Sequence, residues 1–343
     1  MISRENLLLN KCLIIDGQPG CGKTLFSSLF VGYKNIELLN YSTEIENICS
    51  LYNFKSINLT GAKVFIKTHL DLMIYETMMS RRVNFRKNDL SSALNNPNKK
   101  TYIKRLNLKG DSKVPNYIKK NKPILHLATH NLLPISKPLF EAYKNNEKLM
   151  FLVILRHPLY MIDQQIINQK NFIRDKASRN FRIYYKNKNN YLSYWNILNK
   201  QEYVKANCVE KAILDIYYLT LLYNKSLKKK KSNLHIIPFE QFVLNPEKYL
   251  LEVEKKFKLK RDLNFNKILR TQNIPRKKIA DGISLKVYIE KGWKQSIKKF
   301  SEKDEINLRR KSLYKHRVRK KYIQLFEKLI LEYEIKYMKG ILN

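Results

Sequence analysis

The chain has 343 residues, of which 44% are hydrophobic, and its 67 Lys and Arg residues against 29 Asp and Glu give a formal net charge of +38. The apolar content excludes a wholly disordered chain, and the length is enough to bury a core without disulfide or metal support. The four cysteines are scattered without a C-x-x-C pair. This argues against a zinc site and favours a reducing compartment.

The basic charge has two interpretations. Lys, Asn and Ile are all abundant, as in proteins encoded by A/T-rich genes, and a solvated basic surface would explain the excess. Alternatively, so positive a field attracts phosphates, sulfated sugars or nucleic acid, and the attraction weakens as salt rises. The N-terminus leads directly into a strand pattern, and no apolar run approaches ~18 residues. We therefore expect a cytoplasmic protein without a membrane span.

Short apolar runs bounded by polar turns predict the strands. Runs without polar alternation are typical of strands buried on both faces of a parallel sheet. They occupy residues 12–16, 64–66, 124–127, 149–155 and 234–239. Amphipathic stretches predict helices at 22–31, 159–170, 209–229 and 320–337. The alternation predicts a single α/β domain over residues 1–343, with a central parallel sheet flanked by helices.

Two segments interrupt this alternation. Residues 81–122 are strongly basic and contain Pro97 and Gly110, which predicts an insertion of short helices and loops. Residues 172–205 interleave cations with aromatic side chains, and we expect 172–232 to be a helical region beside the acceptor. Aromatic faces among cations stack sugars or bases. The alternative is that these aromatic residues belong to the core.

The most specific motif is a glycine-rich loop directly after the first predicted strand. Residues 17–24 read Gly-Gln-Pro-Gly-Cys-Gly-Lys-Thr, a full match to G-x-x-x-x-G-K-[ST], and a helix pattern follows. The glycines let successive backbone N–H groups point into one concavity, and Lys23 and Thr24 reach phosphate oxygens. We expect a phosphorylated, nucleotide-like ligand at this loop.

A kinase or NTPase with this loop also needs a carboxylate at the end of another buried strand to hold its metal. The best remaining buried strand, 149–155, is followed instead by Arg156. The other acidic candidates, Asp16 and Glu240, do not end a run as apolar as this one. Chemistry on an anion without an obligatory metal is therefore attractive, and sulfuryl transfer is the leading case.

Four segments resemble, in the same order along the chain, those of the PAPS-dependent sulfotransferase family. This family has a P-loop-type α/β fold and uses 3′-phosphoadenosine 5′-phosphosulfate (PAPS) as donor. The loop at 17–24 is similar to the family's 5′-phosphosulfate loop, and 128–134 is similar to its K-T-H-x-x-x-P strand end. Residues 152–158 are similar to its R-x-P strand, and 291–302 to its closing K-G…W-K…F-S segment.

The resemblance implies that the loop binds PAPS. The loop residues implied in this contact are Gly17, Pro19, Gly20, Cys21, Gly22, Lys23 and Thr24. Lys23 is also implied as a catalytic residue that neutralises charge on the transferring group and on the bridging oxygen. Gly20 stands where the family has its catalytic lysine, three positions before Lys23.

The resemblance also implies a second anion site for the 3′-phosphate of the donor. Arg156 would offer its planar fork of donors to this phosphate. Gln164, eight places further along the chain, stands where the family has a serine that binds the same group. Lys291 and Gly292 would approach the phosphate as well, and Trp293 would pack beside the adenine.

His130, at a predicted strand end, is the implied general base. An imidazole has a pKa near the operating pH and takes the proton of an acceptor hydroxyl. His69 is a rival, because residues 67–69 also read K-T-H and keep the family's lysine. Chain order favours His130, which directly precedes the strand that ends at Arg156.

We therefore expect a sulfotransferase that moves the sulfuryl group of PAPS to a hydroxyl of a small-molecule or glycan acceptor, with no metal. The net positive charge favours an anionic acceptor. One alternative is a P-loop kinase or NTPase that uses ATP and Mg²⁺ at the same loop. The other is a basic nucleic-acid-binding module, whose affinity would fall steeply as salt rises. The loop and the arginine-ended strand together favour the transferase, and the sequence does not indicate an oligomeric state.

Overall fold

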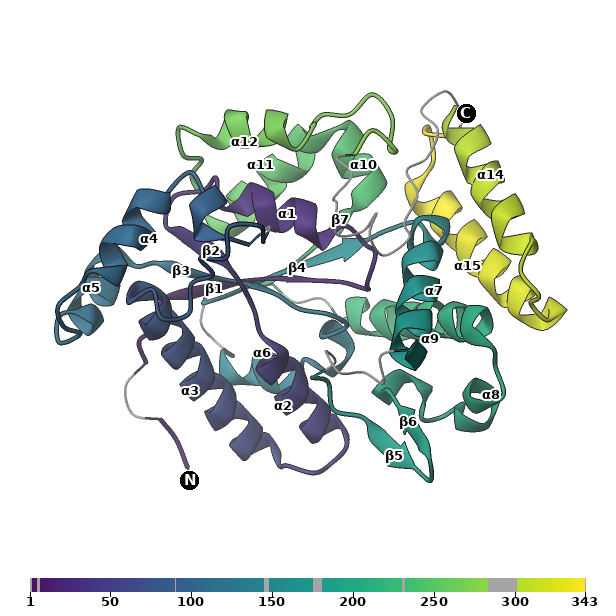
Figure 1. Cartoon of the computed structure of the whole chain (residues 1–343), viewed down its shortest axis with the longest axis horizontal. Coiled ribbons are helices and arrows are strands. Elements are labelled where there is room, and N and C mark those ends of the chain that lie inside the picture. Colours follow the sequence, from purple (N-terminus) through teal and green to yellow (C-terminus); the bar gives the residue numbers. More distant parts are fainter. Residues whose placement is uncertain are drawn as a thin grey trace.

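The structure is a computed structural model that describes residues 2–4, 7–89, 91–144, 148–174, 181–229, 232–282 and 301–342. Its centre is a five-stranded sheet in the order β2-β3-β1-β4-β7, and every neighbouring pair of strands in it is parallel. Helices cover both faces of the sheet (Figure 1). The predicted α/β class, with a central parallel sheet flanked by helices, is confirmed.

Four of the five strands coincide with predicted apolar runs. The strands are β1 (Lys11–Asp16), β2 (Ile36–Tyr41), β3 (Ile124–Ala128), β4 (Leu149–Leu155) and β7 (Leu234–Pro238). Strand β1 pairs with both β3 and β4, so both of its edges are hydrogen-bonded. The carboxyl ends of parallel strands meet at one edge, which is where ligands bind in sheets of this kind.

The prediction of a strand at 64–66 is wrong, because these residues lie within helix α3 (Leu59–Met78). Ile66, Leu70 and Ile74 recur at helical spacing and are fully buried. The side chain of Asn58 caps the first turn of the helix. The short apolar run is one part of a buried helical stripe.

Strand β2 was not among the predicted strands. Glu37 and Asn40 interrupt its apolar pattern, and both are buried. The two carboxylate oxygens of Glu37 accept hydrogen bonds from Arg105 at 2.7 and 3.1 Å. An ion pair supplied by the basic segment therefore allows a charged residue at this edge of the sheet.

The sheet separates two hydrophobic cores. Alternate residues of β1 point into them, with Leu13 and Ile15 in one core and Cys12 and Ile14 in the other. The first core includes residues of α1 (Lys23–Phe30), α7 (Pro158–Arg174), α10 (Phe239–Leu244), α11 (Pro246–Phe257), α12 (Phe265–Thr271), α14 (Glu302–Tyr314) and α15 (Lys320–Tyr337). The second includes residues of α2 (Thr43–Asn53), α3, α5 (Val114–Asn121) and α6 (Lys137–Ala142).

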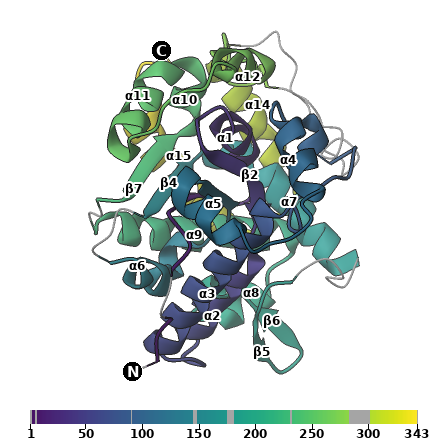
Figure 2. The ribbon, with the colours of Figure 1, turned by 90° about the vertical axis from the view of Figure 1, so that its left-hand side faces the viewer.

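Figure 2 shows α1 with α10, α11 and α12 on one side of the sheet and α2 and α3 on the other. Helix α9 (Cys208–Leu227) contributes to both cores. None of the helices in the described ranges is long and apolar enough to span a membrane.

Two segments interrupt the alternation of strands and helices. Residues 81–122 connect α3 to β3 and contain α4 (Lys99–Leu106) and α5. Region 172–232, predicted to be helical, contains α8 (Lys200–Val204) and α9 but also an antiparallel hairpin of β5 (Tyr185–Asn187) and β6 (Asn190–Leu192). Lys188 turns this hairpin with a φ of 53°. The place of this region beside the acceptor stays a prediction.

The carboxylate of Asp16 joins the end of β1 to the turn after β3 and to α9. Asp16 is fully buried. Its Oδ1 accepts hydrogen bonds from Thr129 Oγ1 at 2.9 Å and from Leu132 N at 3.0 Å. Its Oδ2 accepts from Leu133 N at 2.9 Å and from Tyr223 OH at 2.7 Å. Four donors satisfy the buried charge, so the turn after β3 is held beside the end of β1.

We expect Asp16→Asn to lower the free energy of unfolding by about 2–5 kcal/mol, because an amide group would face donors that now bind a carboxylate oxygen. Urea denaturation followed by circular dichroism measures this change. Asp89→Asn is the control, since the Asp89 side chain is 42% exposed and its loss is expected to cost less than about 1 kcal/mol. Equal stability of wild type and Asp16→Asn would contradict the role of this carboxylate.

Candidate active site

The loop at 17–22 turns at the carboxyl end of β1 and leads into α1. Gly20 and Gly22 have φ angles of 88° and 94°, in the left-handed region that glycine adopts without strain. A Cβ atom at Gly22 would also collide with the ring of Phe239. Helix α1 then begins at Lys23 with no acidic residue in its first turn and no side-chain cap. Its first backbone N–H groups and its dipole therefore favour an anion.

The ammonium group of Lys23 lies against the loop itself. Its Nζ donates hydrogen bonds to Gly17 O at 2.7 Å and to Gln18 O at 3.1 Å. Because these two carbonyls hold the side chain, the positive charge has a fixed place beside the first turn of α1. This place suits the predicted charge-neutralising role.

The other loop residues shape the loop or connect it to its neighbours. The carbonyl of Pro19 accepts a hydrogen bond from Gln165 Nε2 at 3.2 Å. The Sγ atom of Cys21 lies only 2.6 Å from where a Cβ on Gly17 would stand. Burial raises the pKa of the Cys21 thiol, which favours its neutral form. Thr24 lines a groove beside α1.

Arg156 and Gln164 lie against the same loop. Arg156 follows β4, and its Nη1 donates a hydrogen bond to Gly20 O at 2.8 Å. The Cβ atom of Gln164, on α7, lies 3.3 Å from where a Cβ on Gly20 would stand. The loop, the end of β4 and the first part of α7 therefore form one site, which brings these two predicted donor-binding residues together.

Two further arginines, which no sequence motif indicates, join Arg156. Arg276, after α12, shares the ring of Phe239 with it: their Cζ atoms lie 5.6 and 4.3 Å from the ring centroid. Arg309, on α14, shares the ring of Tyr160 with it: their Cζ atoms lie 4.4 and 5.4 Å from that centroid. Arg156, Arg276 and Arg309 are termed the arginine cluster below.

The arginine cluster is only partly neutralised. Burial lowers the pKa of Arg156, the carboxylate of Glu240 offsets part of this change, and the charge of Arg309 lowers the pKa further. Burial and then the charge of Arg156 lower the pKa of Arg276 to about 10. The Nε atoms of Arg156 and Arg276 are buried without a hydrogen-bond partner among the described residues. Arg309 does pair with carboxylates, at 2.8 Å from Glu305 and 3.6 Å from Asp163. An anion bound here would offset both repulsion and desolvation.

The two acidic residues considered as metal ligands both hold protein donors. Asp16 accepts the four hydrogen bonds described above. Glu240 is fully buried, and it accepts hydrogen bonds from His157 N at 3.0 Å and from Tyr333 OH at 2.6 Å. Its Oε1 also lies 4.0 Å from Arg156 Nε. These partners do not fit a kinase-type magnesium site, whose carboxylate needs its oxygens for the metal.

His130 follows β3, and a carboxylate orients its ring. Its Nδ1 lies 3.4 Å from Glu46 Oε1, which also accepts a hydrogen bond from the His130 backbone N at 2.7 Å. The ring stacks on Tyr41, at the end of β2, with centroids 6.5 Å apart. With Nδ1–H donated to Glu46, Nε2 keeps its lone pair, which is the form that a general base needs.

The environment of His130 favours the neutral imidazole. Burial lowers the pKa of His130, the charge of Lys23 lowers it further, and Glu46 offsets part of this change. Burial raises the pKa of Glu46, but its contacts with His130 and Arg182 outweigh that effect and leave the pKa lowered. At neutral pH the site therefore holds an uncharged ring beside an ionised carboxylate.

Asn131 joins the turn after β3 to the loop and is another residue that no motif indicates. Its backbone N donates a hydrogen bond to Gly17 O at 3.4 Å, and its carbonyl accepts one from Tyr194 OH at 2.5 Å. Its side chain is buried, and neither carboxamide atom has a hydrogen-bond partner among the described residues. A ligand that reaches this position finds an unused donor and an unused acceptor.

His69 has a structural environment that differs from that of His130. It lies in α3, and its Nε2 is 3.1 Å from Ser42 Oγ. The same hydroxyl caps α2 by accepting a hydrogen bond from Ile45 N. Burial lowers the pKa of His69. The residue thus supports the start of α2, and His130 stays the better candidate for the base.

The aromatic residues of segment 172–205 have two kinds of environment. Trp195 donates a hydrogen bond from Nε1 to Asp215 at 2.7 Å and packs against the second core. Phe181, Tyr185 and Tyr191 are exposed. Part of the segment therefore belongs to the core, and part is available at the surface.

Lys291, Gly292 and Trp293 lie outside the described residues. Their contacts with the donor stay predictions.

Comparison with known proteins gives weak likenesses. No protein-family model matches the chain, and no curated protein matches it. Among solved structures it resembles the sulfotransferase domain from the curacin biosynthetic pathway, with 12% identity and a TM-score of 0.40 over 89% of this chain and 97% of that chain. It also resembles the sulfotransferase domain from the Synechococcus PCC 7002 olefin synthase, with 11% identity and a TM-score of 0.36 over 93% of this chain and 99% of that chain.

A third resemblance is to a sulfotransferase from Alicyclobacillus acidocaldarius, with 12% identity and a TM-score of 0.34 over 96% of this chain and 97% of that chain. TM-scores this low carry no argument about activity. A functional conclusion therefore depends on the site itself.

We expect Lys23→Gln to raise the pKa of His130 and Glu46→Gln to lower it, because the first removes a positive charge and the second a negative charge near the ring. The chemical shift of His130 Cε1–H against pH measures both changes, and His130→Gln identifies the resonance. Lys303→Gln, on α14, is the control and should leave the titration unchanged. A wild-type His130 pKa above 6.5 would contradict the described environment.

Proposed function

We propose that the chain is a sulfotransferase that transfers the sulfuryl group of PAPS to a hydroxyl group of an acceptor. The observation that supports this most directly is the contact between the arginine cluster and the phosphate loop, where Arg156 Nη1 donates to Gly20 O at 2.8 Å. Two places that favour anions therefore lie side by side. PAPS carries anionic groups at the 5′ and the 3′ position of one ribose, so it matches two adjacent sites.

ATP matches this arrangement less well. It carries all its phosphates in one chain at the 5′ position, and phosphoryl transfer from it uses Mg²⁺ held by a carboxylate. The arginine cluster has no corresponding group to bind on ATP. Asp16 and Glu240 are engaged with protein donors. We therefore favour sulfuryl transfer over phosphoryl transfer.

In the proposed reaction His130 Nε2 takes the proton from the acceptor hydroxyl while that oxygen attacks sulfur. The new S–O bond to the acceptor forms as the S–O bond to the 5′-phosphate breaks, and adenosine 3′,5′-bisphosphate leaves with the electron pair. Lys23 and the backbone N–H groups of the loop stabilise the charge that develops on the bridging oxygen. Glu46 stabilises the imidazolium that forms on His130.

We also propose that the protein acts in the cytoplasm. All four cysteines, namely Cys12, Cys21, Cys49 and Cys208, are free thiols. Free thiols are expected in a reducing compartment.

We expect Arg309→Gln to weaken the binding of adenosine 3′,5′-bisphosphate about tenfold, or ~1.4 kcal/mol, and to leave the binding of adenosine 5′-phosphate unchanged. The reason is that the substitution removes one cation from the arginine cluster only. Isothermal titration calorimetry with the two nucleotides measures the difference.

Arg310→Gln is the matched control for this substitution. Arg310 is the next residue of α14 and pairs with Glu327 at 3.2 Å and Glu334 at 3.3 Å. This variant should bind both nucleotides as the wild type does. Tighter binding of ATP with Mg²⁺ than of adenosine 3′,5′-bisphosphate would overturn the proposed donor.

We expect His130→Gln to slow transfer of ³⁵S from labelled PAPS to a mixture of glycans and hydroxylated compounds by about 10²–10⁴-fold, with unchanged affinity for adenosine 3′,5′-bisphosphate. In the wild type the rate should fall as the pH drops through the pKa of His130, which lies below its usual value. His69→Gln is the control and should keep the rate. If the two variants exchange these outcomes, His69 is the base.

A further inference from the structure

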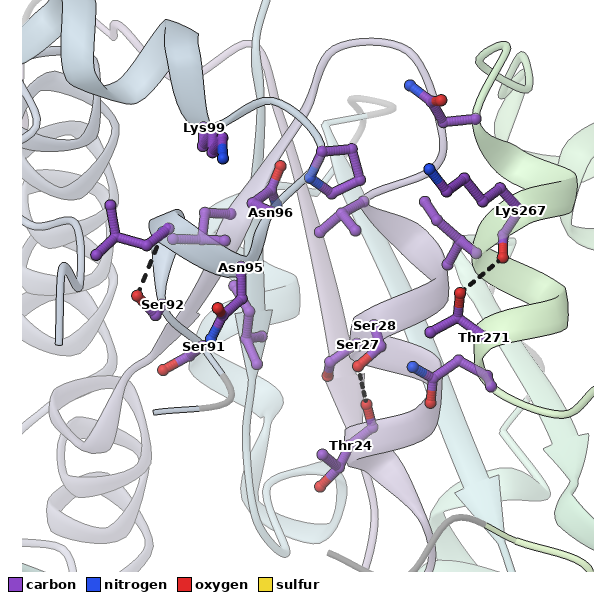
Figure 3. A pocket seen from close by; sticks show the side chains of 18 of the residues that line it. Thr24, Ser27, Ser28, Ser91, Ser92, Asn95, Asn96, Lys99, Lys267 and Thr271 are labelled. Atoms are coloured by element: carbon purple, nitrogen blue, oxygen red, sulfur yellow. Dashed lines mark hydrogen bonds between the residues drawn. The ribbon is translucent and has the colours of Figure 1, made fainter. Parts of the chain in front are cut away.

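A groove of about 560 Å³ runs beside α1 (Figure 3). Residues of α1, β2, the segment 91–99 and α12 line it, and it is termed the α1 groove. Its size lies in the ~300–1,000 Å³ range of sites that bind small molecules. The described groove is therefore large enough for a ligand of several rings.

Most of the residues that line this groove carry hydrogen-bonding or cationic groups, and apolar side chains such as Leu38, Leu94 and Ile268 lie between them. Six aliphatic hydroxyls and four carboxamides line it together with Lys99 and Lys267, and the described lining includes no carboxylate. Segment 81–122, which provides one wall, contains thirteen Lys and Arg residues against two Asp and no Glu. Hydroxyls and carboxamides both donate and accept hydrogen bonds, so this lining matches a ligand with many hydroxyl groups and negative charge.

Ser27 adds an independent observation. It lines the groove and is 3% exposed, and its buried hydroxyl has no hydrogen-bond partner among the described residues. The neighbouring hydroxyl of Ser28 is satisfied, because it donates to Thr24 O at 3.0 Å (Figure 3). A buried hydroxyl without a partner is costly. A ligand group that bonds to Ser27 would offset this cost.

The groove meets the candidate catalytic residues at the carboxyl edge of the sheet. There it includes Thr24, the last residue of the phosphate loop, and Tyr41, whose ring stacks on His130. The arginine cluster packs instead on Phe239, which begins α10 directly after β7, and on Tyr160 of α7. Strands β2 and β7 form opposite edges of the sheet. The groove and the arginine cluster therefore lie toward opposite edges.

This separation matches the geometry of group transfer. In an in-line displacement the attacking and leaving oxygens lie on opposite sides of the transferring group. A donor held by the arginine cluster leaves the β2 side of the loop to the acceptor. The α1 groove occupies that side.

We propose that the α1 groove binds the acceptor and that the acceptor is an acidic oligosaccharide. Its hydroxyl groups bond to the polar lining, including Ser27, and its carboxylate or sulfate groups pair with Lys99 and Lys267. The reacting hydroxyl lies at the end of the groove beside Tyr41 and His130. This inference depends on the proposed function, because an acceptor needs a donor at the loop.

Titration calorimetry at low salt with two oligosaccharides of equal length tests the proposal. Hyaluronan tetrasaccharide carries a carboxylate on every second sugar, and chitotetraose is neutral. We expect the wild type to bind hyaluronan tetrasaccharide at least about tenfold more tightly than chitotetraose. The double variant Lys99→Gln/Lys267→Gln should bind hyaluronan tetrasaccharide about tenfold more weakly than the wild type does. Equal affinity for the two probes in the wild type would overturn the proposal.

A matched control separates the groove from the general charge of the protein. Lys100→Gln/Arg270→Gln changes exposed cations on the same two helices, α4 and α12, by the same total charge, and neither residue lines the groove. It should change the affinity less than about twofold. An equal loss in both double variants would mean that the probe senses only the overall field, and would overturn the proposal.

Ser27→Ala tests the polar lining without changing charge. It should weaken both oligosaccharides several-fold while the unfolding temperature shows that the variant is folded. Unchanged binding of both probes to Ser27→Ala would contradict the part assigned to this hydroxyl.

Binding of adenosine 3′,5′-bisphosphate to the same proteins keeps the two proposals distinguishable. We expect the groove variants to bind it as the wild type does. Competition between this nucleotide and the tetrasaccharide would overturn the groove as acceptor site, since the groove would then hold the nucleoside of the donor. Nucleotide binding without tetrasaccharide binding overturns the groove alone. Tetrasaccharide binding without nucleotide binding overturns the sulfotransferase function.

Discussion

The buried carboxylate of Asp16 is the interaction on which the geometry of the site depends. It accepts hydrogen bonds from the turn after β3 and from Tyr223 of α9, at the point where β1 leads into the phosphate loop. A buried carboxylate needs hydrogen bonds from protein donors because no water reaches it. The carboxylate of Asp16 therefore fixes the position of the turn after β3. That turn carries His130 and Asn131. The relative position of the loop and the candidate base thus follows from an electrostatic requirement inside the fold.

The cations around the loop show the opposite situation. Arg156 and Arg276 stack on one ring, and each retains a buried Nε without a hydrogen-bond partner in the described part of the chain. Burial lowers the pKa of both guanidinium groups, and the charge of Arg309 on Arg156 and of Arg156 on Arg276 lowers it further, so the protonated forms are costly for the folded protein alone. Binding of an anion at this place would offset the cost of burying these charges. The carboxylate of Asp16 is fully satisfied within the fold and positions the site, whereas the Nε atoms of Arg156 and Arg276 keep a hydrogen-bond donor unused.

The fold was largely predictable from the sequence because strands buried on both faces need uninterrupted apolar runs, and the loop at 17–24 has a local signature. The run at 64–66 misled because three residues do not distinguish a strand from a helical stripe. Strand β2 was missed because Glu37 depends on an ion pair with a distant segment. Arg276 and Arg309 could not be found, since they approach Arg156 only through aromatic rings contributed by other elements. A sequence motif reveals residues that act close together in the chain, whereas contacts between residues that are far apart in the chain leave no motif.

The contact between Gly22 and Phe239 has an evolutionary consequence. A larger residue at Gly22 would need a smaller one at Phe239. The same ring, however, is the surface on which Arg156 and Arg276 rest. A smaller residue at Phe239 would remove the ring on which both guanidinium groups stack. Substitution at either position is therefore restricted by the other. Homologues that share this architecture should therefore vary at the two sites jointly or not at all.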